Sequence, residues 1–495
     1  MSYQAYKNHL KQLADVNYAS ALLQWDQEVY MPEKGGSYRA SQISTLSGIA
    51  HQLATDPAFE KIVADLATDN SLSEQEKSNV LRTKRDIEKR KKFTREFVEE
   101  MSHAVSEGFV AWQEAKQKND YSIFQPKLEK LLELKHREVE IAGYEGHPYN
   151  ALLDDYEPGT TVDDVKKVFD DFKPKLKALM DKIFAATPPD DALFYRHYDK
   201  DKQWAFGIDL LKQMGYDFSA GRQDVSAHPF TISFGAGDVR VTTRVNENDL
   251  AEMIWSCIHE GGHALYEQGL PAADYGLPSG EAVSLAIHES QSRLWENNVG
   301  RSLPFWQHNY AKLQSVFPES LAAVGLHDFY KAFNRVQPSL VRTSADELTY
   351  HFHIIIRFEL ELELIEGKLT AANLPAAWNA KYKEYLGIDV PTDTQGVLQD
   401  VHWSHGSFGY FSTYSLGSLY AAQLFAQAQK EIPGLEDSIA AGNTAPLLLW
   451  LREKVHTKGR NTTSRLVCEE VTGQPLNADF FMAYAEKKYS GIYEF

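Results

Sequence analysis

The strongest chemical signal in the sequence is a pair of histidines four residues apart. They lie in the stretch His259-Glu260-Gly261-Gly262-His263. Residues i and i+4 of a helix share one face, so both imidazoles can bind one metal ion while Glu260 lies beside them. This is the arrangement of the His-Glu-x-x-His metallopeptidases. The sequence therefore predicts that His259 and His263 hold zinc and that Glu260 is the general base.

Two glycines inside this motif argue against a chance match on a core helix. Gly261 and Gly262 are consecutive, and each glycine inside a helix costs roughly 1 kcal/mol relative to alanine. Close approach of a substrate chain or of a neighbouring element would explain them. Cys257 precedes the motif and is interpreted as a packed thiol.

The third metal ligand is expected on the next helix, because a catalytic zinc usually has three protein ligands and a water molecule. Glu289 lies 26 residues after His263, within a helix predicted over residues 280–299. His288 is the alternative ligand, since adjacent helical residues point about 100° apart and only one can face the ion. Without the motif, Glu289 would be interpreted as a surface carboxylate. We predict one Zn²⁺ per chain, bound by His259, His263 and Glu289, with Co²⁺ able to substitute.

Most of the remaining chain has the apolar spacing of amphipathic helices. One stretch alternates instead, with residues 230–234 and 239–243 flanking a Gly-Ala-Gly-Asp turn, which predicts a short β-hairpin. Thr161 is a candidate N-cap after the turn at Tyr156-Glu157-Pro158-Gly159. Helices are predicted at 3–25, 37–54, 73–118 (one helix or a pair), 121–142, 162–185, 248–268, 280–299, 303–314, 345–366, 370–386, 411–429, 445–456 and 477–488.

Composition excludes some classes of function. The chain has 495 residues and a formal net charge of −18, which disfavours binding to a phosphate backbone, so no nucleic-acid partner is expected. Two cysteines do not make a secreted disulfide framework. The start of the chain does not resemble a signal peptide, and no apolar run is long enough to span a bilayer. We expect one catalytic domain over residues 1–495, cytoplasmic and without a membrane partner.

Several motifs together give the chain a resemblance to the carboxypeptidase Taq family of metallocarboxypeptidases, over nearly its whole length. One position departs from the expected pattern, because Val341 replaces isoleucine before Arg342. The motifs are Leu23-Gln24-Trp25-Asp26, His228-Pro229-Phe230, the set Asp238, Arg240 and Thr242, the zinc motif, His288-Glu289-Ser290-Gln291, Arg342-x-x-Ala345-Asp346, and Gly396-x-x-Gln399-Asp400-x-His402-Trp403.

The resemblance implies a mainly α fold similar to neurolysin and the angiotensin-converting peptidases. In that fold two helical lobes flank a deep cleft, and a small β-sheet lies beside the zinc. It also implies a homodimer that removes single C-terminal residues with broad specificity. The expected partners are peptides with a free C-terminal carboxylate.

Further site residues follow from this resemblance. The segment from Tyr410 to Tyr420 is rich in phenols, and similarity to the angiotensin-converting fold favours Tyr414 as the oxyanion donor. His402 or His405 would assist it, and Tyr420 is a further candidate for substrate binding. For each of these side chains aromatic or core packing is the alternative.

An exopeptidase must also bind the terminal carboxylate, and the planar fork of arginine suits that task. Arg342 is the family candidate, on a loop before a helix that Ser344 is expected to cap. Its alternative is a salt bridge to Asp346 or Glu347. Arg240 could contact substrate or instead hold a neighbouring helix.

Two other functions stay open. The first is an endo-oligopeptidase on the same scaffold, because nothing in the zinc motif fixes where a peptide is cut. The second is a non-catalytic helical scaffold protein in which zinc is absent or only structural.

Overall fold

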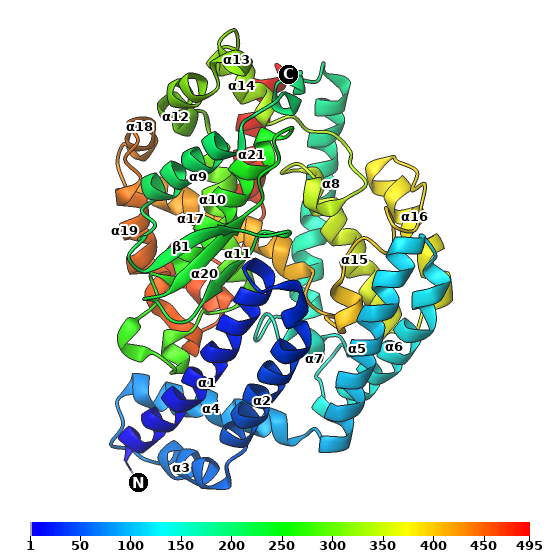
Figure 1. Ribbon diagram of the computed structural model, residues 1–495, viewed down its shortest axis with the longest axis vertical. Coiled ribbons are helices and arrows are strands. Elements are labelled where there is room, and N and C mark those ends of the chain that lie inside the picture. The colour runs from blue at the N-terminus through cyan, green and yellow to red at the C-terminus, as the bar shows by residue number, and fades with distance from the viewer. Residues whose placement is uncertain (1) are drawn as a thin grey trace. The chain divides into compact units, whose positions relative to one another are not determined.

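The chain is mainly helical and has one small β-sheet (Figure 1), as the sequence predicts. The computed structural model describes residues 2–495. Each of its two compact units is assembled from three separate segments. Unit 1 contains residues 2–88, 190–333 and 420–475, and unit 2 contains residues 89–189, 334–419 and 476–495.

Unit 1 contains the β-sheet and the predicted metal motif. Its helices begin with a pair, α1 and α2, that pack against each other. The helices are α1 (Tyr3–Val29), α2 (Gly36–Ala54), α3 (Pro57–Ala67), α4 (Glu74–Lys91), α9 (Lys200–Met214), α10 (Leu250–Glu267), α11 (Leu285–Arg293), a π-helical turn (Leu294–Gly300), α12 (Leu303–Val316), α13 (Pro318–Leu321), α14 (Leu326–Phe333), α18 (Leu435–Ala440), α19 (Ala445–Lys454) and α20 (Ser464–Thr472).

Unit 2 is built from helices joined by loops and short 3₁₀ turns. Helix α17 (Ser412–Glu431) begins in unit 2 and ends in unit 1, and the last residues of α4 also belong to unit 2. The other helices of unit 2 are α5 (Arg95–Lys118), α6 (Tyr121–Ala142), α7 (Asn150–Leu153), α8 (Val162–Ala185), α15 (Thr349–Ile365), α16 (Leu374–Leu386) and α21 (Asp479–Tyr493).

The sheet has three strands in the order β1-β3-β2. Strands β2 (Thr231–Ser233) and β3 (Val239–Thr243) pair antiparallel, which confirms the predicted hairpin. Strand β1 (Gly221–Val225) pairs parallel to β3 and was not predicted. Its consecutive residues Gln223 and Asp224 are polar yet buried, so the sequence of β1 lacks the apolar alternation that marks a strand.

Helix α10 carries the metal motif and is packed on several sides. Asp249 caps its first turn by accepting from the backbone N–H of Ala251 at 3.0 Å and of Glu252 at 3.3 Å. The helix packs against the sheet, α9 and α11 (Figure 1). Apolar residues buried on α10 include Met253, Ile254, Ile258 and Leu265.

The two glycines of α10 allow the neighbouring helices to approach closely. A Cβ on Gly262 would lie 2.7 Å from Ser292 Cα and 2.8 Å from the carbonyl oxygen of Gln291, both backbone atoms of α11. A Cβ on Gly261 would lie 2.6 Å from the Leu211 side chain of α9. Of the two explanations offered for these glycines, the structure therefore supports close packing of neighbouring elements.

Most predicted helices are present, with differences at their ends. The region 73–118 is a pair of helices, and Thr161 caps α8 in a full capping box with Asp164. The helix predicted over 280–299 begins at Leu285 and changes to the π-helical turn after Arg293. The helices that were not predicted are α3, α7, α9, α13, α14, α18 and α20.

The predicted N-cap at Ser344 is wrong. Residues Arg342–Ser344 form a 3₁₀ turn, and α15 begins only at Thr349. The carboxylate of Asp346 lies 2.9 Å from the backbone nitrogens of both Leu348 and Thr349. Because Asp346 already accepts from these first N–H groups of the helix, the helix start moves past Ser344.

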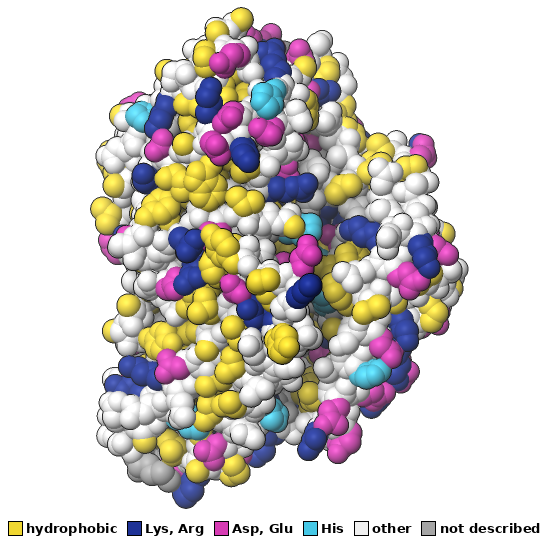
Figure 2. Space-filling model, in the orientation of Figure 1, with side chains coloured by type: hydrophobic (Ala, Val, Ile, Leu, Met, Phe, Trp, Pro, Cys, Tyr) yellow, Lys and Arg dark blue, Asp and Glu magenta, His cyan; other side chains and the backbone are white. Residues whose placement is uncertain are grey.

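Charged side chains of both signs are mixed on the face shown in Figure 2. Among the described residues, no helix is both long and apolar enough to cross a membrane.

Replacement of Gly262 by alanine should destabilise the protein. The added methyl group would contact the backbone of α11, which cannot move as a flexible side chain does, so we expect a loss of about 1–3 kcal/mol, as for other overpacked sites. Urea unfolding at fixed metal concentration measures the change. Gly48→Ala in α2 is the matched control, because no atom lies within 4 Å of its Cβ position. That control should be neutral or slightly stabilising, and equal unfolding midpoints for both variants would contradict the packing argument.

Candidate functional site

The three predicted metal ligands converge in unit 1. His259, His263 and Glu289 offer ligand atoms that all lie within 4.8 Å of one another. Glu289 Oε2 is 3.4 Å from His263 Nε2 and 3.9 Å from His259 Nε2. A tetrahedral zinc site with bonds of about 2.0–2.1 Å places its ligand atoms about 3.3–3.4 Å apart. The group is therefore close to the size of a zinc site, and its donor atoms are those that zinc prefers.

A carboxylate holds the ring of His259 at the nitrogen that does not face the other ligands. Its Nδ1 atom lies 2.7 Å from Glu296 Oε2, on the π-helical turn that follows α11. Since Nδ1 donates to Glu296, the Nε2 atom of a neutral ring keeps its lone pair for a metal. Glu296 is itself bound by Arg293 at 3.2 Å and Arg301 at 3.5 Å.

The ring of His263 is held by a second imidazole. His288 Nδ1 lies 2.6 Å from His263 Nδ1, and His288 Nε2 lies 2.8 Å from Glu267 Oε1. Both nitrogens of His288 are thus engaged away from the three ligand atoms. The geometry favours Glu289 over His288 as the third ligand.

Glu260 lies on the flank of the motif and is buried. Thr231 of strand β2 orients it, because Thr231 Oγ1 lies 2.6 Å from Glu260 Oε2 and 3.0 Å from the Glu260 carbonyl oxygen. This contact connects the β-hairpin to the metal helix.

Buried charges around the ligands keep the carboxylates ionised. Burial alone would raise the pKa of Glu289, but Arg293 and His259 hold it well below its usual range. Burial likewise opposes ionisation of Glu296, yet Arg293 and His259 lower its pKa to about 2. Both groups therefore stay negative near neutral pH, as a dication requires.

A second cluster of polar side chains lies in unit 2, around Asp400. Its Oδ1 atom accepts from Arg342 Nε at 3.0 Å and Nη2 at 2.9 Å, and its Oδ2 atom accepts from Arg357 at 2.6 Å. Burial opposes ionisation, but the two arginines hold the pKa of Asp400 far below its usual range. Two arginines share one carboxylate, so this trio carries a net positive charge.

Arg342 is therefore paired with neither Asp346 nor Glu347, which corrects the alternative considered for it. Asp346 caps α15 instead, and Glu347 accepts from Lys488 at 2.7 Å. Arg342 also donates to Tyr350 Oη at 3.1 Å. Its guanidinium lies over the Tyr414 ring, 4.9 Å from the centroid.

His402 and Tyr414 are neighbours in unit 2. His402 Nε2 lies 3.3 Å from Tyr414 Oη, and the Nδ1 atom of His402 is buried without a hydrogen-bond partner. Burial lowers the pKa of His402 to about 3. Asp400 opposes this shift, while the positive charges of Arg342 and Arg357 add to it. The ring is therefore neutral at physiological pH.

The remaining predicted site residues make other contacts. His405 is exposed and packs against Phe109 with tilted rings, at 5.1 Å between ring centroids. Tyr420 is buried on α17. Arg240 pairs with Asp238 at 2.8 Å and lies over the Trp25 ring of α1, 4.4 Å from its centroid. These contacts fit the alternative in which Arg240 holds a neighbouring helix.

Sequence reasoning assigned no role to several residues that contact the predicted ligands and base or the side chains that support them. Helical spacing was the available signal, because Glu267 follows His263 by four residues and Glu296 follows Glu289 by seven. Thr231 gave no such signal, since only the folded hairpin brings it to Glu260. The overlooked residues are Thr231, Glu267, Arg293, Glu296 and Arg301.

Comparison with known proteins shows the family of this chain. A family model described as carboxypeptidase Taq (M32) metallopeptidase matches residues 5–489. The chain belongs to this family. It is 42% identical to thermostable carboxypeptidase 1 of Thermus thermophilus over 99% of each chain. It is 38% identical to carboxypeptidase 1 of Bacillus subtilis, covering 98% of this chain and 97% of that one.

A solved structure of a family member has the same fold. The M32 carboxypeptidase of Deinococcus radiodurans R1 is 40% identical, and the alignment covers 100% of this chain and 99% of that one with a TM-score of 0.98. The predicted family is confirmed. The protein is a peptide hydrolase of the metallocarboxypeptidase type, so it requires a metal and acts on peptides.

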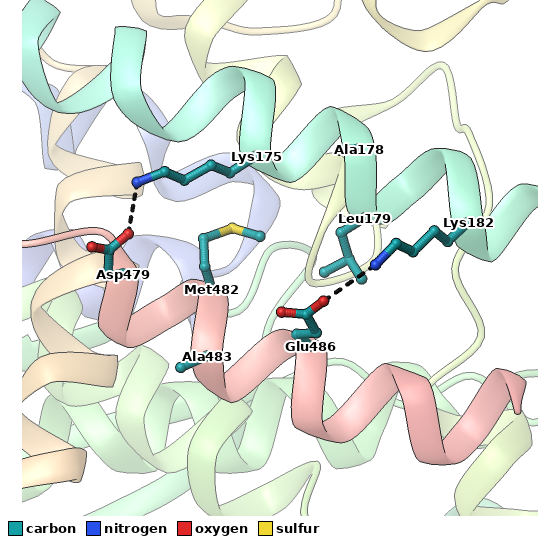
Figure 3. A pocket seen from close by; sticks show the side chains of 8 residues that line it. All are labelled: Lys175, Ala178, Leu179, Lys182, Asp479, Met482, Ala483 and Glu486. Atoms are coloured by element: carbon teal, nitrogen blue, oxygen red, sulfur yellow. Dashed lines mark hydrogen bonds and ion pairs between the residues drawn. The ribbon is translucent and has the colours of Figure 1, made fainter. Parts of the chain in front are cut away.

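A groove elsewhere in unit 2 of this M32 peptidase does not have the features of a peptidase site. It lies between α8 and α21 (Figure 3). Lys175 pairs with Asp479 at 2.7 Å, and Lys182 pairs with Glu486 at 3.2 Å. Its cations and anions are therefore paired with each other.

Removal of the Asp400 charge should strongly destabilise this M32 peptidase. In Asp400→Asn two buried arginines lose their shared anion, and breaking a buried pair in this way costs about 3–5 kcal/mol. The pKa of Asp400 is lowered by folding, so its stabilising effect is present above the unfolded-state pKa and is lost as the pH falls. The difference from the unmodified protein should be complete above about pH 5 and shrink below about pH 3.9.

Urea unfolding of both proteins from pH 7 downward measures this difference. The matched control is Asp389→Asn, whose carboxylate pairs with Lys383 at 2.8 Å on the surface. That control should change stability by less than about 1 kcal/mol. A loss for Asp400→Asn no larger than that of the control would show that the trio is not a stabilising network.

Proposed function

We propose that the protein is a zinc-dependent carboxypeptidase that removes single C-terminal residues from peptides, with Glu260 as general base. The observation that supports zinc is the convergence of two imidazoles and one carboxylate. Each imidazole uses its Nδ1 atom for a hydrogen bond, which leaves Nε2 for the ion. Two nitrogens and one oxygen are a common ligand set of catalytic zinc.

The chemistry divides between the metal and the chain's own residues. When bound, zinc would polarise the scissile carbonyl and make water more acidic. Glu260 takes the proton of the attacking water and then delivers it to the leaving amine. Thr231 fixes the direction of that carboxylate, since its hydroxyl lies 2.6 Å from Oε2.

The proposal assigns the terminal carboxylate of the substrate to Arg342. A guanidinium has five N–H donors, and three of those of Arg342 are engaged by Asp400 and Tyr350. Two donors are then left for a ligand. The net positive charge of Arg342, Asp400 and Arg357 favours an anion there. Arg240 and Tyr420 are secondary candidates for substrate contact.

Tyr414, with His402 beside it, is the proposed donor to the oxyanion. His402 is neutral, so it can accept from or donate to the Tyr414 hydroxyl without adding a charge. A positioned donor of this kind stabilises the charge that develops on the carbonyl oxygen. His405 is the weaker candidate of the two histidines, because it is exposed and packs against Phe109.

Five other features stay predictions from the sequence. We propose that units 1 and 2 act together as one catalytic domain and that the protein is a homodimer in the cytoplasm. Broad specificity belongs with these, and so does the replacement of zinc by cobalt. The alternative function is an endo-oligopeptidase on the same scaffold.

Glu260→Gln tests the general base. The amide keeps the size of the side chain and its contact with Thr231, but it cannot take a proton. We expect unchanged zinc content and a loss in kcat of about 10²-fold or more, the range for lost acid–base catalysis. Metal analysis and a peptide digest measure the two quantities. Loss of zinc from this variant would show that Glu260 is a ligand.

The matched variant is Glu289→Ala, which should lose zinc first and activity as a consequence. The unmodified enzyme should carry about one zinc per chain. A chelator should abolish its activity, and zinc or cobalt should restore it. Full activity after exhaustive metal removal would contradict the metal assignment.

Arg342→Lys tests where the terminal carboxylate binds. Arg342→Met is less suitable, because it would leave buried Asp400 with one partner fewer. Lysine keeps the charge but loses the planar fork, so we expect kcat/KM on free-acid peptides to fall by about two decades, the equivalent of about 3 kcal/mol. C-terminally amidated peptides should be poor substrates of the unmodified enzyme.

Arg357→Lys is the control, because Arg357 shares Asp400 but is fully buried. It should lower the melting temperature while the preference for free-acid over amidated peptides is retained. Equal cleavage of amidated and free-acid peptides by the unmodified enzyme would favour the endo-oligopeptidase. Normal cleavage of free acids by Arg342→Lys would place the carboxylate elsewhere.

A further inference from the structure

We propose that His288, supported by Glu267, is a positioning residue that fixes the ring of His263 for metal binding. Sequence reasoning considered His288 only as an alternative ligand. The inference rests on the proposed role of His263 as a zinc ligand. It goes further, because it assigns a function to two residues that do not touch the metal position.

The contacts form a chain of two short hydrogen bonds. His263 Nδ1 lies 2.6 Å from His288 Nδ1, and His288 Nε2 lies 2.8 Å from Glu267 Oε1. Glu267 follows His263 by four residues on α10, so both lie on one face of that helix, while His288 comes from α11. These two hydrogen bonds therefore connect α10 to α11 and α11 back to α10.

Only one arrangement of protons allows both hydrogen bonds to form when the metal is bound. His263 must keep the lone pair of Nε2 for the metal, so its proton lies on Nδ1 and is donated to His288 Nδ1. His288 then carries its own proton on Nε2 and donates it to Glu267. A carboxylate only accepts, so Glu267 fixes the direction of both hydrogen bonds. His288 thereby selects the tautomer of His263 that can bind a metal.

The packing holds His288 in this position. The side chain of His288 is 21% exposed and that of Glu267 is 17% exposed. The ring centroid of His288 lies 4.6 Å from that of His263 and 5.3 Å from that of Tyr266. Close approach of the two helices at Gly262 brings α11 within reach of His263.

The two ligand imidazoles are thus supported differently. The Nδ1 atom of His259 donates directly to the carboxylate of Glu296 at 2.7 Å, whereas the Nδ1 atom of His263 is connected to the carboxylate of Glu267 through His288. A direct carboxylate makes the ligand more basic, while an intervening neutral ring mainly fixes orientation and tautomer. His288 therefore acts on geometry at the metal.

Three substitutions of His288 separate orientation from packing. The amide of asparagine places an oxygen near the position of histidine Nδ1, so His288→Asn can still accept from His263. The amide of glutamine lies one carbon further out, near Nε2, and leucine offers no acceptor. We expect zinc to bind about 10–100-fold more weakly to His288→Gln and His288→Leu. His288→Asn should lose less than about 10-fold, although it changes the side-chain volume more than glutamine does.

Chelator competition for zinc on the full chain gives these affinities without reference to activity. The visible absorption of the cobalt-loaded protein is a second readout, since a reoriented imidazole changes the ligand geometry around cobalt. Glu267→Leu should weaken zinc binding in the same direction, because His288 loses the acceptor that fixes its tautomer. If His288 had only a structural role, the loss of zinc affinity would follow the change in side-chain volume, and His288→Asn would not bind zinc more tightly than His288→Gln.

His456→Asn is the matched control. His456 is a buried histidine of the same unit that contacts α11 through Gln291 at 3.1 Å and packs on Tyr266. It should lower the melting temperature and leave zinc affinity unchanged. Equal affinities for the unmodified protein and all three His288 variants would overturn the inference. Failure of the ligand assignment is separate, because it would appear as retained zinc in His263→Ala or Glu289→Ala.

Discussion

The close approach of α10 and α11 at Gly262 sets the geometry on which the metal side of unit 1 depends. A side chain there would overlap backbone atoms of Gln291 and Ser292. That distance lets Glu289 reach the imidazoles from one side of α11, while His288 contacts His263 from the next position. Adjacent residues point in different directions, so a single close contact provides both a ligand and its support. Each glycine costs the helix roughly 1 kcal/mol relative to alanine. In return, the close contact positions both Glu289 and His288 at the imidazoles.

Buried charge is arranged differently in the two units. In unit 1 the sequence of contacts Glu289, Arg293, Glu296, Arg301 alternates in sign, and one carboxylate oxygen of Glu289 stays directed at the imidazoles. In unit 2 a carboxylate lies between two cations, because Arg342 and Arg357 both pair with Asp400. Ions buried in this way lose several kcal/mol of hydration each, which their partners must offset. The network in unit 1 balances its charges and leaves Glu289 suited to a cation, whereas the trio in unit 2 keeps a net positive charge suited to an anion.

The sequence predicted the residues whose spacing is local and missed those that depend on tertiary contacts. His259, His263 and the hairpin at 231–243 have fixed spacings, and the structure places them as predicted. Strand β1 was missed because Asp224 is a buried polar residue, held by Arg222 and Tyr30. The partner of Arg342 could not be predicted either. Asp400 lies 58 residues away in the sequence, and the local candidate Asp346 is occupied by the start of α15.

The interleaved order of the segments has a consequence for synthesis on the ribosome. Unit 1 needs residues 2–88, yet its last segment begins at Tyr420. At about 5–20 residues per second, the intervening 331 residues take roughly 17–66 s to emerge. Tyr6, Phe59 and Val80 form a cluster with Leu277. Leu277 follows Glu88 by 189 residues, so this cluster stays incomplete for roughly 9–38 s of that interval. Nascent chains of this protein therefore expose the apolar side chains of these helices during that part of translation, and transiently exposed apolar surface of this kind is prone to aggregation.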